Sequence, residues 1–402
     1  MNREEKKIMR LTVGAHGLVH LYEGVLPPLI PLLMKEFSTD YFHLGLVVTV
    51  FSYAFGLGSL PAGILADRIG PRRLVTVFLF GAGLSAALIF PIDSLLLYAA
   101  AMGVVGAFCS LYHPASNTLI SLGIRSPGHA FGIHGIAGSL GVATVPLLSA
   151  WIGSQAGWRA PHVLYGLAGM ALGCYSLTLP RYSTRAREAT SASSTDAPKR
   201  GHSVDMLALT LFFLSATALG LSYKGIMTFL PVYMGQNVIG GGGLDPVALG
   251  GTFATIALVS GAGGQYLAGR LVDRFRPEAI YLGSVAMGTV FVFAMAAAKG
   301  WLLVVFSVLY AFFYFSVQPT QNFLISRYLP AHRRGLGYGV LFLLTFGVGS
   351  TAAAVSGYLA DRFGLESVFW AMGLCFLASA LLVTALLLRS GKHRRGDIPA
   401  AA

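Results

Sequence analysis

The sequence predicts an all-α membrane protein of twelve transmembrane helices, arranged as two pseudo-symmetric six-helix bundles. Three observations lead to this fold class. The 402 residues are 55% hydrophobic and 11% charged, whereas soluble domains carry about 25% charged residues. Gly, Pro and charged clusters divide the chain into twelve apolar segments long enough to cross a bilayer. Finally, three strings from the first half of the chain recur in the second half in the same order.

The first predicted span continues well beyond the apolar run of a signal peptide and shows no cleavage site, so we expect it to remain as a helix. The twelve predicted spans are residues 8–34, 43–67, 73–92, 94–121, 128–153, 161–180, 205–235, 247–273, 278–298, 300–328, 333–362 and 366–389. The three cysteines lie inside apolar segments without paired spacing, so neither disulfides nor a cysteine zinc site is expected. No cofactor is predicted.

The positive charges indicate the orientation of the chain in the membrane. With both termini in the cytoplasm, 23 of the 28 Lys and Arg residues fall on the inside, as the positive-inside rule requires. The formal charge of +12 is therefore a topology signal, and no nucleic-acid partner is expected. We expect a protein of the bacterial inner membrane.

Composition also marks the domain boundaries. Residues 181–204 are rich in Ser, Thr, Ala and Arg and have no apolar period, which is typical of a flexible linker. This predicted cytoplasmic linker separates an N-terminal bundle, residues 1–180, from a C-terminal bundle, residues 205–389. Residues 390–402 are predicted to form a cytoplasmic tail.

The two halves repeat each other. The matching pairs are HPASNTLIS at 113–121 with QPTQNFLIS at 318–326, GILADRIGPRR at 63–73 with GRLVDRFRPE at 269–278, and YEGVL at 22–26 with YKGIM at 223–227. Three matches in one order at nearly one offset indicate a duplication. Membrane carriers built from such repeats bind substrate between their halves near the bilayer midplane.

Span 1 carries an unusual polar stripe. His16, His20 and Glu23 fall within roughly 60° of one another around a helix. Ionisable groups are costly in hydrocarbon and normally face a bundle interior or a water-filled cavity. His113 and His134 are expected at a depth similar to that of His16. Imidazoles suit proton transfer and also bind transition metals; the alternative is that these side chains only lock neighbouring helices together.

Other spans supply further polar residues to this candidate path. The predicted substrate or proton pathway comprises His16, His20, Glu23, His113, Asn117, His134, Tyr223, Lys224, Tyr314, Gln318, Gln321 and Asn322. Whether a metal binds there is left open. The repeat places Lys224 opposite Glu23 at matched positions, and an unpaired charge in the membrane is costly. We therefore expect these two to lie within salt-bridge or one-water reach when that side of the protein is closed.

The Gly-x-x-x-Asp-Arg-x-Gly-x-Arg-Arg pattern at residues 63–73, echoed at 269–278, resembles the signature loop of the major facilitator superfamily. The His-rich first span, the run GVLPPLIPLL and the His113-Pro114 pair resemble the fosmidomycin-resistance group of drug exporters. The chain departs from that group at His20 and Ala115, where the group carries acidic residues. It also lacks the superfamily's usual Arg in span 4.

This resemblance implies a cytoplasmic gate that closes in the outward-open state. The gate residues are Gly63, Asp67, Arg68, Arg72, Gly269, Asp273 and Arg274. A carboxylate there can cap a neighbouring helix N-terminus or pair with an Arg; the alternative is a static loop anchor. A third similar string, GYLADRFG at 357–364, falls on the outer side and is expected to be only a helix end.

Three classes of function follow, in order of preference. The first is a secondary active transporter that exports a small organic compound in exchange for protons by rocking its two halves. The second is a transition-metal or organic-anion carrier, suggested by the His cluster and by Lys224 respectively. The third is a sensor or membrane enzyme, which is less favoured because HExxH, zinc-type Cys and P-loop motifs are missing. We expect a monomer.

Overall fold

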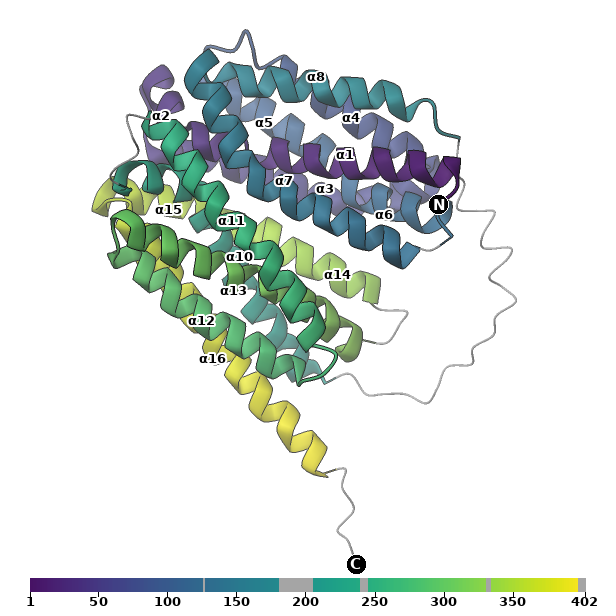
Figure 1. The fold of residues 1–402 in the computed structure, drawn as a ribbon, viewed down its shortest axis with the longest axis vertical. Helices are drawn as coiled ribbons and strands as arrows, with labels where there is room; N and C mark the ends of the chain where they lie inside the picture. The colour runs from purple at the N-terminus through teal and green to yellow at the C-terminus, as the bar shows by residue number, and fades with distance from the viewer. Residues whose placement is uncertain (126, 181–204, 239–244, 330–333, 397–402) are drawn as a thin grey trace, which may run out of the picture.

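The computed structural model describes residues 1–125, 127–180, 205–238, 245–329 and 334–396 (Figure 1). The regular elements of these residues are all helices. The predicted linker, residues 181–204, lies outside the described residues, as do the last six residues of the chain. The side chains of residues 67, 127, 128, 334–336 and 391–396 are also not described.

Six predicted spans form the N-terminal half. Its helices are α1 (Arg3–Gly24), α2 (Leu26–Phe37), α3 (Tyr41–Ile69), α4 (Pro71–Ala87), α5 (Leu95–Cys109), α6 (Tyr112–Gly123), α7 (Pro127–Ala156) and α8 (Arg159–Ser176). The helices α1 and α2 together correspond to the first predicted span, and α5 and α6 together to the fourth.

The C-terminal half repeats this order. Its elements are α10 (Met206–Asn237), α11 (Pro246–Leu271), α12 (Pro277–Ala297), α13 (Gly300–Tyr328), α14 (Arg334–Phe342), the π-turn η2 (Leu343–Gly347), the 3₁₀ turn η3 (Val348–Ser350), α15 (Thr351–Phe363) and α16 (Glu366–Gly396). The four elements from α14 to α15 correspond to the eleventh predicted span.

Three spans that we predicted as continuous helices are interrupted. A proline has no N–H to give to the carbonyl four residues earlier. Pro28 therefore leaves the carbonyl of Gly24 without its helical partner, where α1 ends, and Pro114 does the same to Ser110, where α5 ends. In the eleventh span a π-turn and a 3₁₀ turn replace regular helix at residues 343–350, a type of irregularity that is frequent at functional sites.

The last helix is longer than predicted. α16 runs to Gly396, seven residues past the expected boundary at 389. Lys392, Arg394 and Arg395 belong to this extension, and cations near a helix C-terminus are stabilised by the helix dipole. The predicted tail is therefore partly helical.

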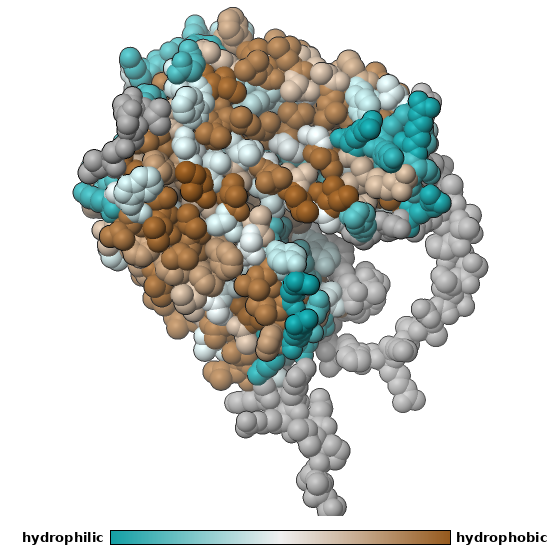
Figure 2. All heavy atoms as spheres, viewed as in Figure 1, coloured by the Kyte–Doolittle hydropathy of each residue, from teal (hydrophilic) through white to brown (hydrophobic). Residues whose placement is uncertain are grey.

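The surface fits a lipid environment. Within the described residues, ten helical segments are long and apolar enough to cross a bilayer; α4 and α8, with 17 and 18 residues, complete the twelve. Apolar side chains cover much of the face drawn in Figure 2, and hydrophilic ones gather near the helix ends. Large apolar residues such as Leu96 and Phe90 are 78% and 66% exposed. Such extensive apolar exposure is what lipid contact requires.

The two halves meet mainly on one side. We call the side where α1 begins and α16 ends the terminus side, and the other the far side. Across the halves, α3 packs on α15 and α7 on α11. In the far-side part of these contacts, the Trp151 indole N–H donates to Thr252 at 3.0 Å and the Leu147 N–H donates to Thr255 at 3.1 Å. Toward the terminus side the ribbons of the halves diverge (Figure 1).

Candidate functional site

Four predicted imidazoles gather in the N-terminal half around His16 of α1. The ring centroid of His16 lies 4.0 Å from that of His134 on α7, 5.0 Å from that of His20 and 5.2 Å from that of His113 on α6. His16 and His134 are only 7% and 5% exposed. The structure thus brings together the three imidazoles expected at similar depth, those of His16, His113 and His134, and adds His20 to them.

Hydrogen bonds fix the proton positions on two of these rings. Nδ1 of His16 lies 2.7 Å from the carbonyl oxygen of His134, which can only accept, so this nitrogen donates. The Tyr112 hydroxyl gives its single hydrogen to the Thr12 carbonyl at 2.6 Å, so Nε2 of His134 must donate to Tyr112 at 2.8 Å. Nε2 is therefore the protonated nitrogen of His134, and neutral His16 keeps a lone pair on Nε2.

One glycine makes room for the His16 ring. A Cβ atom at Gly138 of α7 would lie 2.5 Å from Nε2 of His16, so any larger residue would have to move the imidazole. Gly138 stands one helical turn after His134. Sequence reasoning did not identify it, nor did it identify Tyr112 and Ser116, whose hydroxyl oxygens lie 2.8 and 2.9 Å from Nε2 of His134.

Glu23 extends the cluster to the other half of the protein. One of its carboxylate oxygens accepts from Nδ1 of His20 at 3.2 Å, and the other accepts from Nζ of Lys224 on α10 at 2.6 Å. The side chains of Glu23 and Lys224 are 12% and 7% exposed. The salt bridge expected from the repeat is confirmed, and it joins α1 to α10.

Aromatic side chains surround the Lys224 end of this pair. Nζ of Lys224 lies 5.3 Å from the ring centroid of Phe346 in η2, a cation–π distance. Tyr223 stacks on Tyr314 of α13, with centroids 5.0 Å apart and the planes 7° from parallel. Tyr223, Lys224, Glu23 and His20 line one pocket together with apolar residues of α7 and α11. The pocket thus lies between the halves.

The same imidazoles also have the composition of a metal site. One ring nitrogen from each of His16, His20 and His113 lies within 4.8 Å of the other two. Neither ring nitrogen of His113 hydrogen-bonds to a described residue. Neutral imidazole nitrogens are ligands that zinc, copper, iron and nickel accept.

Other predicted pathway residues lie apart from the cluster. Gln318 accepts from Gln265 at 2.7 Å, and Gln265 in turn accepts from Ser139 across the halves at 2.7 Å. Gln321 is buried and donates to the Tyr281 hydroxyl at 2.9 Å, so it faces the interior of the C-terminal half. Asn117 and Asn322 are exposed on the surface of their helices.

The two glycines of the predicted gate contact no neighbouring helix in this conformation. A Cβ atom at Gly63 or Gly269 would meet nothing within 4 Å. Arg68, Asp273 and Arg274 are exposed and form no ion pair with another described residue. The side chain of Asp67 lies outside the part of the chain that the structure describes.

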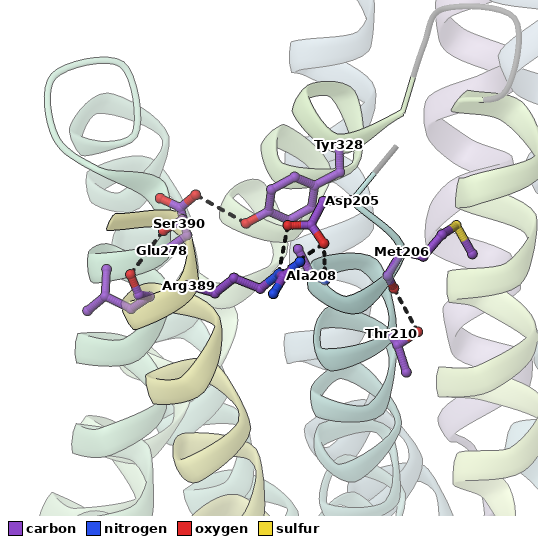
Figure 3. A network of polar contacts seen from close by, with 9 residues as sticks. Asp205, Met206, Ala208, Thr210, Glu278, Tyr328, Arg389 and Ser390 are labelled. Carbon is purple, nitrogen blue, oxygen red and sulfur yellow. Dashed lines mark hydrogen bonds and ion pairs between the residues drawn. The ribbon is translucent and has the colours of Figure 1, made fainter. Parts of the chain in front are cut away.

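Polar networks on the terminus side instead tie helices within each half. In the C-terminal half, Asp205 accepts from the Ala208 N–H at 3.1 Å and from Arg389 of α16 at 2.7 Å (Figure 3). Beside them, the Tyr328 hydroxyl donates to Glu278 at 3.1 Å. In the N-terminal half, Arg125 donates to Glu5 at 3.0 Å. These bonds favour motion of each half as a unit.

Comparison with known proteins agrees with this architecture. Residues 12–354 match the family model described as Major Facilitator Superfamily. The fosmidomycin resistance protein of Escherichia coli is 24% identical over 411 residues, which cover 95% of this chain and 93% of that one. The gallate transporter of Pseudomonas putida is 24% identical over 413 residues, covering 92% and 89%.

Other relatives match over shorter stretches. A probable L-galactonate transporter of E. coli is 27% identical over 147 residues, which cover 36% of this chain and only 32% of that protein. An uncharacterized MFS-type transporter of Bacillus subtilis, YqjV, is 26% identical over 267 residues, covering 62% of this chain and 60% of that one.

Solved structures show the same fold. A bacterial homologue of the human lysosomal transporter Spinster, in an inward-facing and occupied conformation, superposes with a TM-score of 0.77 at 13% identity over all of both chains. A D-xylose–proton symporter superposes with a TM-score of 0.73 at 16% identity, covering 94% of this chain and 97% of that one. The chain therefore belongs to the Major Facilitator Superfamily, and it is an integral membrane transporter of small molecules rather than an enzyme.

Proposed function

We propose that this protein is a proton-coupled exporter of a small organic compound. The observation that carries the proposal is the continuous contact from His16 through His20 and Glu23 to Lys224, which leads from the imidazole cluster to the boundary between the halves. The relatives named for fosmidomycin resistance and puromycin resistance support export of organic compounds.

In this proposal the terminus side is cytoplasmic and the protein is inward-facing. The excess of Lys and Arg on that side supports the orientation, and both termini are then cytoplasmic. Contacts between the halves on the far side then close the protein to the exterior. The location is the inner membrane of a bacterium, and the carrier works as a monomer.

The Glu23–Lys224 pair connects protonation to opening. While Glu23 is ionised it attracts Lys224 and holds α1 against α10. A proton that passes from the imidazoles to Glu23 makes it neutral and removes this attraction. A lone buried ammonium is costly, so the freed Lys224 favours a conformation in which water reaches it from outside.

Substrate has to act on the same pair for exchange to occur. A bound compound that hydrogen-bonds to Glu23 or Lys224 also separates them, so it opens the far side without a proton. Substrate and proton compete for the Glu23–Lys224 pair, so the carrier moves only one of them at a time. In each cycle the substrate then leaves the cell in one step and the proton enters in the other. The empty, deprotonated carrier stays closed to the exterior, held by the salt bridge, and opens only with a proton or a substrate.

The test is a flux screen in proteoliposomes over a panel of small organic compounds, with and without a pH gradient. Faster accumulation of a compound in the vesicle lumen when the lumen is the acid side supports proton exchange, because protons then leave as the compound enters. Transport of a compound at the same rate with and without the pH gradient would contradict proton coupling. No flux for any compound would contradict export of organic compounds.

A second candidate is a transition-metal carrier, and the three imidazole nitrogens within 4.8 Å of one another favour it. Quenching of an entrapped metal-sensitive dye, without any need for a pH gradient, would support this candidate over the first. Loss of the quenching in His16→Gln would place the metal in the cluster.

An organic-anion carrier is the third candidate, and the position of Lys224 favours it. Lys224 lines the pocket, and a substrate carboxylate could replace that of Glu23 on its ammonium. A relative named as a gallate transporter supports this choice of substrate class. Transport of carboxylates but not of their amides would distinguish it from the first candidate.

A further inference from the structure

The string GYLADRFG, residues 357–364 on the far side, contacts the other half of the protein. We expected it to be only a helix end. In the structure both carboxylate oxygens of Asp361, at the end of α15, accept backbone hydrogen bonds from the start of α3 in the other half. The Tyr41 N–H donates at 3.1 Å and the Phe42 N–H at 2.8 Å.

These donors belong to a helix N-terminus. The first N–H groups of a helix have no partner within it, and an anion placed there also interacts favourably with the helix dipole. Asp40, the N-cap of α3, accepts from the His43 N–H at 2.9 Å. The N-cap Asp40 thus accepts from the third N–H group of the helix, that of His43. Asp361 of the other half accepts from the first two, those of Tyr41 and Phe42.

The Gly-x-x-x-Asp spacing explains how the contact forms. Gly357 stands one helical turn before Asp361. A Cβ atom at Gly357 would overlap the Tyr41 carbonyl and lie 2.7 Å from Cα of Phe42. The glycine therefore lets the backbone of α15 touch the start of α3, and the aspartate one turn later reaches its free N–H groups.

In the two terminus-side copies of the Gly-x-x-x-Asp spacing, the glycine has no such close contact. A Cβ atom at Gly63 or Gly269 would meet nothing within 4 Å. The glycine of the motif thus packs against the other half on the far side, whereas neither terminus-side glycine does.

We propose that Gly357 and Asp361 form a far-side clasp that holds the transporter closed to the exterior, as the counterpart of the terminus-side motifs. It is a gating site of the transport cycle. The inference rests on the proposed function only for the statement that the far side faces the exterior. It does not depend on the substrate or on protons.

The experiment measures opening of the far side directly, without substrate or gradient. Spin labels are placed at Leu96→Cys and Leu302→Cys, which are 78% and 62% exposed at far-side helix ends of the two halves. Cys109, Cys174 and Cys375 are first replaced by Ser. The ratio of long to short inter-label distances then reports the ratio of open to closed carrier.

Asp361→Ala should raise the ratio of open to closed carrier by roughly 2- to 30-fold, the range that loss of a helix cap produces. Asp361→Asn keeps one acceptor oxygen and should raise it less. Asp93→Ala, which removes an exposed far-side carboxylate that bonds to no described residue, is the matched control and should leave it unchanged.

A second variant breaks the same contact in a different way, so that an effect of Asp361→Ala can be told apart from misfolding. Gly357→Ala should push α15 from α3 and raise the ratio while Asp361 is still present. Gly283→Ala, whose Cβ would meet nothing within 4 Å, is its control. If Asp361→Ala and Gly357→Ala, still monodisperse in detergent, give the same distance distribution as their controls, the clasp does not hold the far side and the proposal is wrong. This outcome would leave proton-coupled export untouched.

Discussion

The two halves of the transporter share one backbone plan and differ in chemistry at matched positions. Where the N-terminal half has His113, the C-terminal half has Gln318; where the first has Glu23, the second has Lys224. The four clustered imidazoles all belong to the N-terminal half. Around the pocket, the C-terminal half supplies stacked tyrosines and the ammonium of Lys224. After duplication the fold was kept in both copies, while the titratable groups were concentrated in one.

This comparison identifies the Glu23–Lys224 pair as the point where the two chemistries meet. Its carboxylate contacts the imidazoles of one half, and its ammonium contacts the aromatic side chains of the other. Changes to the pair should therefore have the largest effect, changes within the His cluster a smaller one, and changes to the matched C-terminal amide the smallest.

The first prediction concerns the pair itself. Glu23→Gln leaves the ammonium of Lys224 buried without its partner, which should cost about 3–5 kcal/mol in the free energy of unfolding. Adding Lys224→Met removes the stranded charge, so the double variant should be more stable than Glu23→Gln alone. Unfolding in mixed micelles provides the double-mutant cycle. Additive effects of the two changes would mean that the pair is not coupled.

The second prediction concerns the space that the His16 ring occupies. Gly138→Ala forces the imidazole to move and should cost about 1–3 kcal/mol of stability, as overpacking does. It should also slow gradient-driven transport and alter its pH dependence. Gly135→Ala, on the same helix with nothing within 4 Å of its Cβ, is the control. Equal behaviour of the two variants would show that the position of the His16 ring does not matter.

The third prediction compares the matched positions. Gln318→Ala removes one exposed hydrogen bond to Gln265 and should change stability by less than about 0.5 kcal/mol. Its response to a pH gradient should stay close to that of the unmodified protein. His113→Gln, the equivalent change in the N-terminal half, should weaken that response. A stronger effect of Gln318→Ala than of His113→Gln on the pH response would reverse the assignment of chemistry to the halves.

Much of this arrangement follows from local sequence. Apolar length and the repeat predict the twelve spans, and helical periodicity places His16, His20 and Glu23 on one face of α1. The repeat also brings Glu23 and Lys224 together, because equivalent helices of the two halves meet at their boundary. These inferences need only helix geometry and the cost of a charge in hydrocarbon.

Other features depend on contacts that no local pattern contains. Asp361 caps a helix more than 300 residues away, so its role depends on how closely α15 approaches α3. The need for a glycine at position 138 depends on a ring from another helix. Gln321 follows Gln318 by three residues, which turns it about 60° around the helix axis. That rotation is enough to direct it into the C-terminal half instead of the pathway.

The most direct measurement of the central claim compares two modes of transport in one variant. His16→Gln, His20→Gln and His113→Gln are combined, and the protein is reconstituted with a substrate found by the flux screen. Because substrate can still separate Glu23 from Lys224, exchange of labelled for unlabelled substrate should survive, while uphill transport driven by a pH gradient should be lost. Full gradient-driven transport by the triple variant across the pH range would contradict the claim that the N-terminal imidazoles couple protons to transport.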